Sequence, residues 1–167
     1  MARAELIETI ETVRLRLAPL ALSDAAAMIN GHRPERARWV EGYPTDGSLV
    51  SACFVLTAEA EGRALGPWTA YQIARKPDGA IIGDSGFLGP PDHLGHVHLG
   101  YGIAEVAHHQ AYATEALTAL IAWARNRPEV TRILADTAHT NQASIRVMEG
   151  AGMRRAGSDG EIVYYEA

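Results

Sequence analysis

The sequence predicts a single domain of the mixed α/β (α+β) class that spans residues 1–167. A length of 167 residues is close to that of one ordinary domain. Apolar residues make up 47% of the chain and charged residues 21%, which is typical of a globular protein with a hydrophobic core. Segments with the alternating apolar pattern of strands are interspersed with segments that carry apolar residues at helical spacing. We therefore expect helices packed on a mixed sheet.

The first half of the chain predicts one strand and two helices. From Val13 to Pro19, apolar residues alternate with arginines, which indicates a half-buried strand. Ser23 is suited to cap a helix that ends at Gly31. Turn-forming residues follow at 42–47, and apolar residues then recur at helical spacing from Leu49 to Ala60, which predicts the second helix.

The middle of the chain predicts strands. Residues 68–75 and 80–88 are rich in apolar and aromatic side chains, and the compact turn at 77–79 between them indicates an antiparallel hairpin. A further strand is expected at 96–103. Antiparallel neighbours exclude a uniformly parallel, doubly wound sheet. The glycine motif of a dinucleotide-binding turn is also missing.

The last third predicts a helix at 113–126, ended by Pro128, and a shorter helix at 141–150. Short strands are expected at 133–137 and 162–165. The predicted order is therefore β, α, α, β, β, β, α, β, α, β.

Charge and cysteine content exclude several classes of protein. Fifteen Lys and Arg against twenty Asp and Glu leave a net charge of -5, so the chain has no general attraction for nucleic acid or an anionic membrane. Cys53 is the only cysteine, which excludes an intramolecular disulfide, and its apolar helical position predicts a buried packing role. Without a membrane-length apolar run or a signal-peptide pattern, we expect a soluble, cytoplasmic protein.

One segment carries a chemical signal. Residues 100–117 predict a strand, a turn of small residues and the start of a helix. The first backbone N–H groups of a helix have no partners within it, and the helix dipole adds positive potential there, so such a start can bind phosphate. Most connections of this kind bind no ligand, so the pattern alone leaves both readings open.

Four strings in the chain resemble the GNAT superfamily of acetyl-CoA-dependent N-acetyltransferases. They are ETVRLRLAPL, IIGDSGFLG, YGIAEVAHHQAYATEAL and NQASIRVMEGAGM, in that order along the chain. The chain looks most like the branch that includes ribosomal-protein alanine N-acetyltransferases. The resemblance implies a mixed, mostly antiparallel sheet of six to seven strands flanked by about four helices. It also implies that the protein can form a homodimer.

The resemblance implies that acetyl-CoA, the co-substrate, lies along the end of the strand at 96–103 and on the turn that follows. The residues that match those positions are Ile103, Ala104, Glu105, Val106, His108, His109, Gln110, Ala111, Tyr112, Ala113 and Thr114. Asn141 and Ser144, one turn apart on the next helix, are expected to contact the same ligand, although Asn141 can also cap that helix.

Three positions depart from the family pattern. His108 stands where the family carries Gln or Arg, and Ala111 stands where it carries glycine. A methyl group at Ala111 is costly if its φ is positive. Met148 occupies a position that is tyrosine in many members, and it cannot protonate a thiolate.

Candidate catalytic roles follow from proton chemistry. His98 is the candidate base for the acceptor amine, because histidine titrates near neutrality, but it can equally be a packed or solvated strand residue. Ser144 or solvent is the candidate acid for the thiolate. The backbone N–H of Ile103 or Ala104 is the candidate donor to the thioester oxygen. Glu115 is expected to interact with the helix dipole.

Trp39, Glu41 and Tyr43 lie between the first two helices, where the resemblance implies one wall of the acceptor site. Aromatic rings and a carboxylate there suit a cationic amine, although Trp39 can equally belong to the core.

We thus expect an N-acetyltransferase that acts on a primary amine, either a protein N-terminus or a small molecule, by direct attack. The alternative is a non-catalytic acyl-CoA binding or sensing domain of the same fold. A metal site at His93, His96 and His98 is a third reading, but no carboxylate or cysteine pattern completes it, so we expect none.

Overall fold

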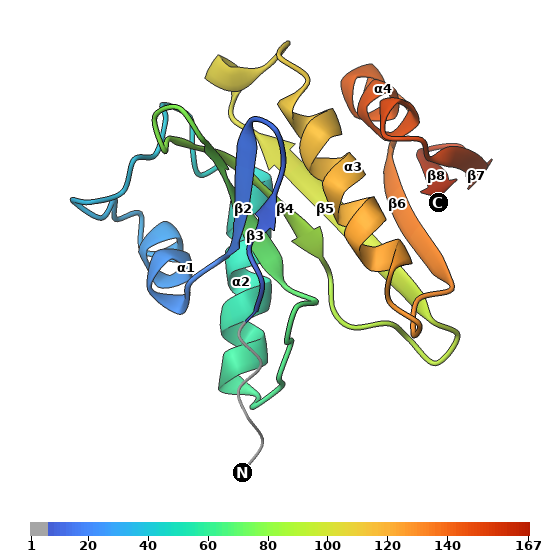
Figure 1. The fold of residues 1–167 in the computed structure, drawn as a ribbon, viewed down its shortest axis with the longest axis horizontal. Coiled ribbons are helices and arrows are strands. Elements are labelled where there is room, and N and C mark those ends of the chain that lie inside the picture. The colour runs from blue at the N-terminus through green and yellow to red at the C-terminus, as the bar shows by residue number, and fades with distance from the viewer. Residues whose placement is uncertain (1–6) are drawn as a thin grey trace.

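The computed structural model describes residues 7–167, which form one eight-stranded sheet with helices on both faces (Figure 1). The strands lie side by side in the order β1-β2-β3-β4-β5-β6-β8-β7. Their bounds are β1 Ile10–Glu11, β2 Leu15–Pro19, β3 Ala70–Arg75, β4 Ile81–Phe87, β5 His96–Ile103, β6 Arg132–Ala138, β7 Arg154–Ser158 and β8 Ile162–Glu166. The helices are α1 Leu22–Ile29, α2 Asp46–Ala60, α3 Tyr112–Arg125 and α4 Gln142–Gly150, and a 3₁₀ turn, η1, covers Glu105–Ala107.

Every pair of neighbouring strands is antiparallel except β5 and β6, which are parallel. Their pairing is short: it joins His96 to Arg132 and ends where His98 pairs with Leu134. Beyond that point β5 pairs only with β4, and β6 pairs only with β8. The sheet therefore splits between the C-terminal ends of β5 and β6, which leaves backbone groups there free to bind a ligand.

The main core lies between the sheet and α3. Leu117 and Leu120 of α3 are fully buried against strand residues such as Leu17, Ile73 and Ile133. In Figure 1, α3 crosses the front of the sheet and α4 stands beside its N-terminal end. Burial of these apolar side chains is the main force that holds α3 against the strands.

A second, smaller core lies on the opposite face of the sheet, under α1 and α2. Ala25 and Met28 of α1 pack there with Ala52 and Val55 of α2. The two helices contact each other extensively, and α2 lies behind β2 and β3 in the view of Figure 1.

The predicted class, the four helices and the six predicted strands are confirmed. The sheet contains two further strands, β1 and β7, that the sequence did not predict. β1 is only two residues long and pairs with β2. β7 is exposed along its whole length, so it has no alternating apolar pattern, and its pairing with β8 places it in the sheet. Both lie at sheet edges, where partners rather than local sequence define a strand.

Two details of the helices differ from the sequence-based expectation. Ala21, and not Ser23, is the residue at the N-cap of α1, and no side chain caps that helix. Helix α2 starts at Asp46, earlier than the apolar repeat indicated, because Thr45 and Ser48 form a reciprocal capping box.

The predicted burial of Cys53 is wrong. Its side chain is exposed, because it follows Ala52 onto the outer surface of α2. No helix within residues 7–167 has both the length and the apolar character needed to cross a bilayer.

Candidate active site

A cavity of about 620 Å³ opens where β5 and β6 separate. One wall is the end of β5, formed by Tyr101, Gly102 and Ile103. The other walls come from the turn before α3, from the first turn of α3 and from α4. The lining residues there are Ala107, His108, His109, Ala111, Tyr112, Ala113, Thr114, Asn141, Ala143, Ser144, Arg146 and Val147.

Backbone groups of β5 point alternately toward β4 and toward the split. The carbonyl of His98 accepts from Leu88 N–H at 3.0 Å, and Ala104 N–H donates to the carbonyl of Ile82 at 2.8 Å. Even-numbered residues of β5 therefore face β4, and the amides of Tyr101 and Ile103 face the split. Of the two predicted oxyanion donors, Ala104 is already bonded within the sheet, and Ile103 remains oriented toward the cavity.

The turn before α3 has an unusual backbone conformation. His109 has φ 60° and Ala111 has φ 59°, a region that residues with a Cβ seldom adopt. The positive φ that would make Ala111 costly is thus present. Ala111 is the N-cap of α3, and no side chain caps that helix. The N–H groups of the first turn are therefore directed at the cavity without a partner from the cap.

His108 closes the base of this turn. Its Nε2 lies 2.7 Å from the carbonyl oxygen of Ile103, so the imidazole joins the turn to the end of β5. Three other predicted cofactor residues, Glu105, Val106 and Gln110, are exposed and do not line the cavity.

Asn141 and Ser144 meet at the start of α4. Asn141 caps the helix by accepting from Ser144 N–H at 3.1 Å, and both residues line the cavity. Met148 points away from it and is fully buried in the main core. The helix therefore presents Ala143, Ser144, Arg146 and Val147 to the cavity, with Asn141 at its cap, and no side chain from position 148.

Tyr101 reaches across the cavity from β5 to α4. Its hydroxyl donates to the Ser144 carbonyl at 2.9 Å, and its Oη lies 2.6 Å from Ser144 Oγ. Burial raises the pKa of Tyr101, although the hydrogen bond with Ser144 opposes that rise. Tyr101 was not among the residues predicted for the site. Its position directly before Gly102 and Ile103, at the end of the strand, could have indicated that it lies at the cavity.

A second cavity, of about 260 Å³, lies on the face of the sheet that carries α2. Its floor is formed by Gly86 and Gly100, which pair across β4 and β5, and by Asp84. Gly47, Ser51 and other residues of α2 cover it. Because Tyr101 lines both cavities, they adjoin at that residue.

Asp84 is the one buried carboxylate of the described residues. It is 4% exposed and pairs across the sheet with Gly102. Ser51 donates to its Oδ1 at 3.4 Å, and its Oδ2 has no hydrogen-bond partner among residues 7–167. Burial raises the pKa of Asp84 to about 6, with the hydroxyls of Ser48 and Ser51 opposing the shift. An acidic residue in the glycine-flanked apolar strand IIGDSGFLG was the signal that sequence reasoning missed.

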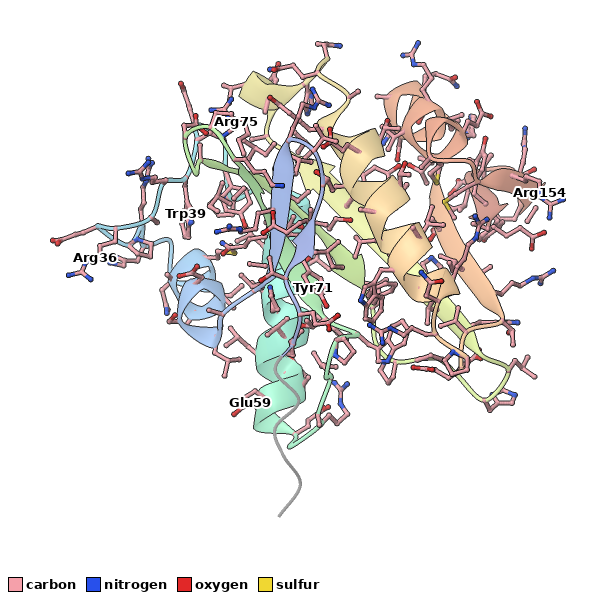
Figure 2. The ribbon with its side chains drawn as sticks, viewed as in Figure 1. Arg36, Trp39, Glu59, Tyr71, Arg75 and Arg154 are labelled. Atoms are coloured by element: carbon pink, nitrogen blue, oxygen red, sulfur yellow. The ribbon has the colours of Figure 1, made fainter. Side chains whose placement is uncertain are left out.

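The predicted acceptor residues occupy two environments, because Trp39 and Tyr43 are buried together and Glu41 is exposed. Trp39, labelled in Figure 2, is 4% exposed and packs edge-on against Tyr43 with ring centroids 5.5 Å apart. Tyr43 is buried, and its oxygen accepts from Gln72 Nε2 at 3.4 Å. Burial raises the pKa of Tyr43, and the nearby Asp84 charge adds to the rise. Glu41 is exposed and lies on the rim of this loop.

His98 lines neither cavity. It projects from the same face of β5 as Gly100, and its Nε2 lies 2.6 Å from Oδ1 of Asp136 on β6. Nearby, His96 Nδ1 is 3.8 Å from an oxygen of Asp92. Within residues 7–167, no three His, Cys, Asp or Glu side chains gather closely enough to hold a metal ion.

Glu115 makes structural contacts. Its carboxylate accepts from the hydroxyl of Thr12 at 2.6 Å and from both the backbone and the guanidinium of Arg14. These bonds tie the start of α3 to the turn before β2. Although burial raises the pKa of Glu115, the contacts with Thr12 and Arg14 lower it more, so the net shift is downward.

Comparisons with known proteins agree with this geometry. Residues 14–154 match the family described as Acetyltransferase (GNAT) domain. The "Uncharacterized N-acetyltransferase YjdG" of Bacillus subtilis (strain 168) is 30% identical over an alignment of 154 residues that covers 86% of this chain and 88% of that protein.

Two solved structures share the fold. RimJ of Mycobacterium smegmatis, solved in complex with CoA-disulfide, has a TM-score of 0.67 and 21% identity over 97% of this chain and 88% of that one. A Salmonella typhimurium acetyl transferase that modifies the N-terminal serine of ribosomal protein L7/L12 has a TM-score of 0.67 and 17% identity. That match covers 96% of this chain and 98% of the other.

Proposed function

The chain belongs to the GNAT acetyltransferase family, and on that premise we propose that it transfers acetyl from acetyl-CoA to a primary amine by direct attack. The observation that carries the proposal is the cavity between β5 and β6, with its uncapped helix start and free strand edge. The acceptor is a protein N-terminus or a small-molecule amine.

The residues present fit acetyl-CoA. The first N–H groups of α3, at Tyr112, Ala113 and Thr114, suit the pyrophosphate, because they lack a cap and lie at the positive end of the helix dipole. The outward-facing amides of Tyr101 and Ile103 suit the amide-bearing arm, in the way that a neighbouring strand would. Asn141 and Ser144 on α4 face that arm from the opposite side.

Bound acetyl-CoA supplies an activated acetyl thioester. The backbone N–H of Ile103 or Tyr101 stabilises negative charge on the thioester oxygen, because such donors are fixed before the reaction begins. Ser144 and Tyr101 share a hydrogen bond at the cavity wall and deliver the proton that the departing thiolate needs. Most of the catalysis is positioning of the two reactants.

Calorimetric titration with acetyl-CoA tests the site. Ala143 lines the cavity on α4, and the adjacent Gln142 does not. We expect Ala143→Trp to weaken acetyl-CoA binding about 10-fold or more, because the indole occupies the ligand volume. Gln142→Trp is the matched control and leaves the Kd unchanged. Equal affinity in the two variants, or no binding by the wild type at millimolar concentration, contradicts the proposed site.

A second function is favoured by one observation. Met148 stands where many members of the family carry the tyrosine that protonates the thiolate, and it is fully buried in the main core, which suits a domain that binds acyl-CoA without turnover. Release of free thiol from acetyl-CoA in the presence of amines distinguishes the two functions, because only the enzyme releases it.

Two further expectations are retained as proposals. The protein forms a homodimer and acts in the cytoplasm, and sedimentation velocity at micromolar concentration tests the first of these.

A further inference from the structure

We propose that Asp84 binds the ammonium group of the acceptor and removes its proton, and that the cavity beside it takes a slim, apolar amine. This inference deepens the proposed function and rests on it.

The position of Asp84 relative to the split supports this role. Asp84 pairs with Gly102, which belongs to the wall of the acetyl-CoA cavity. Toward the other end of the cavity, a Cβ built at Gly100 would meet no atom within 4 Å, whereas one built at Gly86 would meet the carbonyl oxygen of Thr69 at 2.4 Å. The open space near Asp84 therefore lies over Gly100, next to the backbone of Tyr101.

The described residues around Asp84 supply no positive charge to balance its carboxylate. The groups that face Asp84 are Ser48 and Ser51 of α2, Tyr43 of the preceding loop and Gln72 of β3. None of them is a cation, and Asp84 belongs to no ion pair among residues 7–167. A buried carboxylate with one free oxygen is costly, and an ammonium ligand relieves that cost.

The burial of Asp84 also suits proton transfer. Its raised pKa, about 6, leaves it ionised at neutral pH and still basic enough to accept a proton from an adjacent ammonium. His98 has the right type of side chain, but its Nε2 is occupied by Asp136 and it lines neither cavity.

The rest of the cavity indicates the class of acceptor. Its walls include Val50 and Phe54 of α2 and Leu88 after β4, and Val50 and Leu88 are exposed at 65% and 53%. Apolar side chains that are exposed around a cavity favour an apolar ligand. A carboxylate beside the amine would be repelled by Asp84. The expected acceptor is a primary amine on an unbranched apolar or aryl-alkyl chain without an adjacent carboxylate.

The reaction balances with these groups. Asp84 takes one proton from R–NH₃⁺, and the nitrogen lone pair of R–NH₂ attacks the thioester carbon. The carbon–sulfur bond breaks as the C–N bond is completed. The second nitrogen proton leaves to water, Ser144 and Tyr101 give one proton to the thiolate and regain one from water, and Asp84 releases its proton to water. The products are the N-acetyl amide, free thiol and one H⁺.

The test uses 2-phenylethylamine as the probe and phenylalanine as its carboxylate-bearing counterpart. The measurement is ¹³C NMR of protein with labelled aspartate carboxyls and bound coenzyme A. The carboxyl signal that is present in the wild type and absent from Asp84→Asn is assigned to Asp84. We expect 2-phenylethylamine to lower the pKa read from this signal and phenylalanine to leave it in place. An Asp84 signal that does not respond to 2-phenylethylamine overturns the inference.

Turnover supplies an independent readout. We expect Asp84→Asn to lower kcat/KM for 2-phenylethylamine about 100-fold or more and to abolish the acidic limb of the pH profile, with acetyl-CoA affinity unchanged. Asp159→Asn, at an exposed carboxylate in the turn between β7 and β8, is the matched control. A pH limb that persists in Asp84→Asn and is lost in His98→Ala overturns the assignment. If the wild type does not bind acetyl-CoA at all, the proposed function fails, and that result is distinct from a failure of the role inferred for Asp84.

Discussion

The hydroxyl oxygens of Tyr101 and Ser144 lie 2.6 Å apart, and this contact joins β5 to the first turn of α4 across the cavity. From the sequence, the candidate acid for the thiolate is Ser144 or solvent, because Met148 occupies the helix position of the usual tyrosine. The tertiary structure supplies a phenol from the strand instead.

Removal of either hydroxyl is expected to slow thiolate protonation. Tyr101→Phe and Ser144→Ala should each lower kcat about 10- to 100-fold and leave the Kd for acetyl-CoA nearly unchanged. Because the two groups share one hydrogen bond, the double variant should lose little more than either single variant. Tyr164→Phe, at an exposed tyrosine of β8, is the control. Fully additive losses would contradict a shared proton path.

Asp84→Asn is expected to stabilise the fold at neutral pH. The folded pKa of Asp84 is raised to about 6 from its ordinary 3.8, so the folded wild type holds this proton more tightly than the unfolded chain. The free energy of unfolding of the wild type therefore falls as pH rises from about 4 to about 6, and it stays lower above that range. Relative to the wild type, Asp84→Asn should gain about 2 to 3 kcal/mol over this interval.

Urea unfolding at several pH values measures this gain. For Asp159→Asn, the free energy of unfolding relative to the wild type should fall as pH rises, because the hydroxyl of Tyr164 and nearby backbone N–H groups lower the pKa of Asp159. If Asp84→Asn is destabilised equally at every pH, the carboxylate has a structural role. Asp84 would then not lower the stability of the fold for the sake of activity.

Glu115→Gln is expected to loosen the attachment of α3. Above pH 5 the variant should lose about 1 to 2 kcal/mol of unfolding free energy, because Thr12 and Arg14 donate to a carboxylate whose pKa is lowered. The loss should shrink as pH falls through the folded pKa, since the wild-type carboxylate then becomes protonated. Glu11→Gln removes the exposed ion pairs of Glu11 with Arg16 and Lys76 and should lose much less stability than Glu115→Gln in the same denaturation series.

Ala111 is predicted to be a strained position. At φ 59°, Ala111→Gly should raise the free energy of unfolding by up to about 1 kcal/mol, and Ala111→Val should lower it by about 2 kcal/mol. Ala122→Gly, at an exposed position inside α3, should lower it by about 1 kcal/mol. Thermal unfolding of the three variants decides the point, and a loss of stability in Ala111→Gly would exclude strain there.

Elements with strong internal patterns could be predicted from the sequence. The apolar stripe of α3 and the alternation in β2 reflect burial on one face, which every folded arrangement of these segments must satisfy. β7 could not be predicted in this way, because all five of its residues are exposed and only β8 defines it. For the site, the turn at Ala111 and the cap at Asn141 were predictable from local backbone chemistry.

By itself the sequence determined the order of the main strands and helices, the turn that leads into α3 and the cap that Asn141 forms with Ser144 on one helix. These depend on neighbours within a few residues. Only the tertiary structure decided that Tyr101 reaches Ser144 and that Asp84 is buried beside Gly102 without a cation. Strand register and the split between β5 and β6 set those contacts, and they arise from long-range pairing that no local pattern encodes.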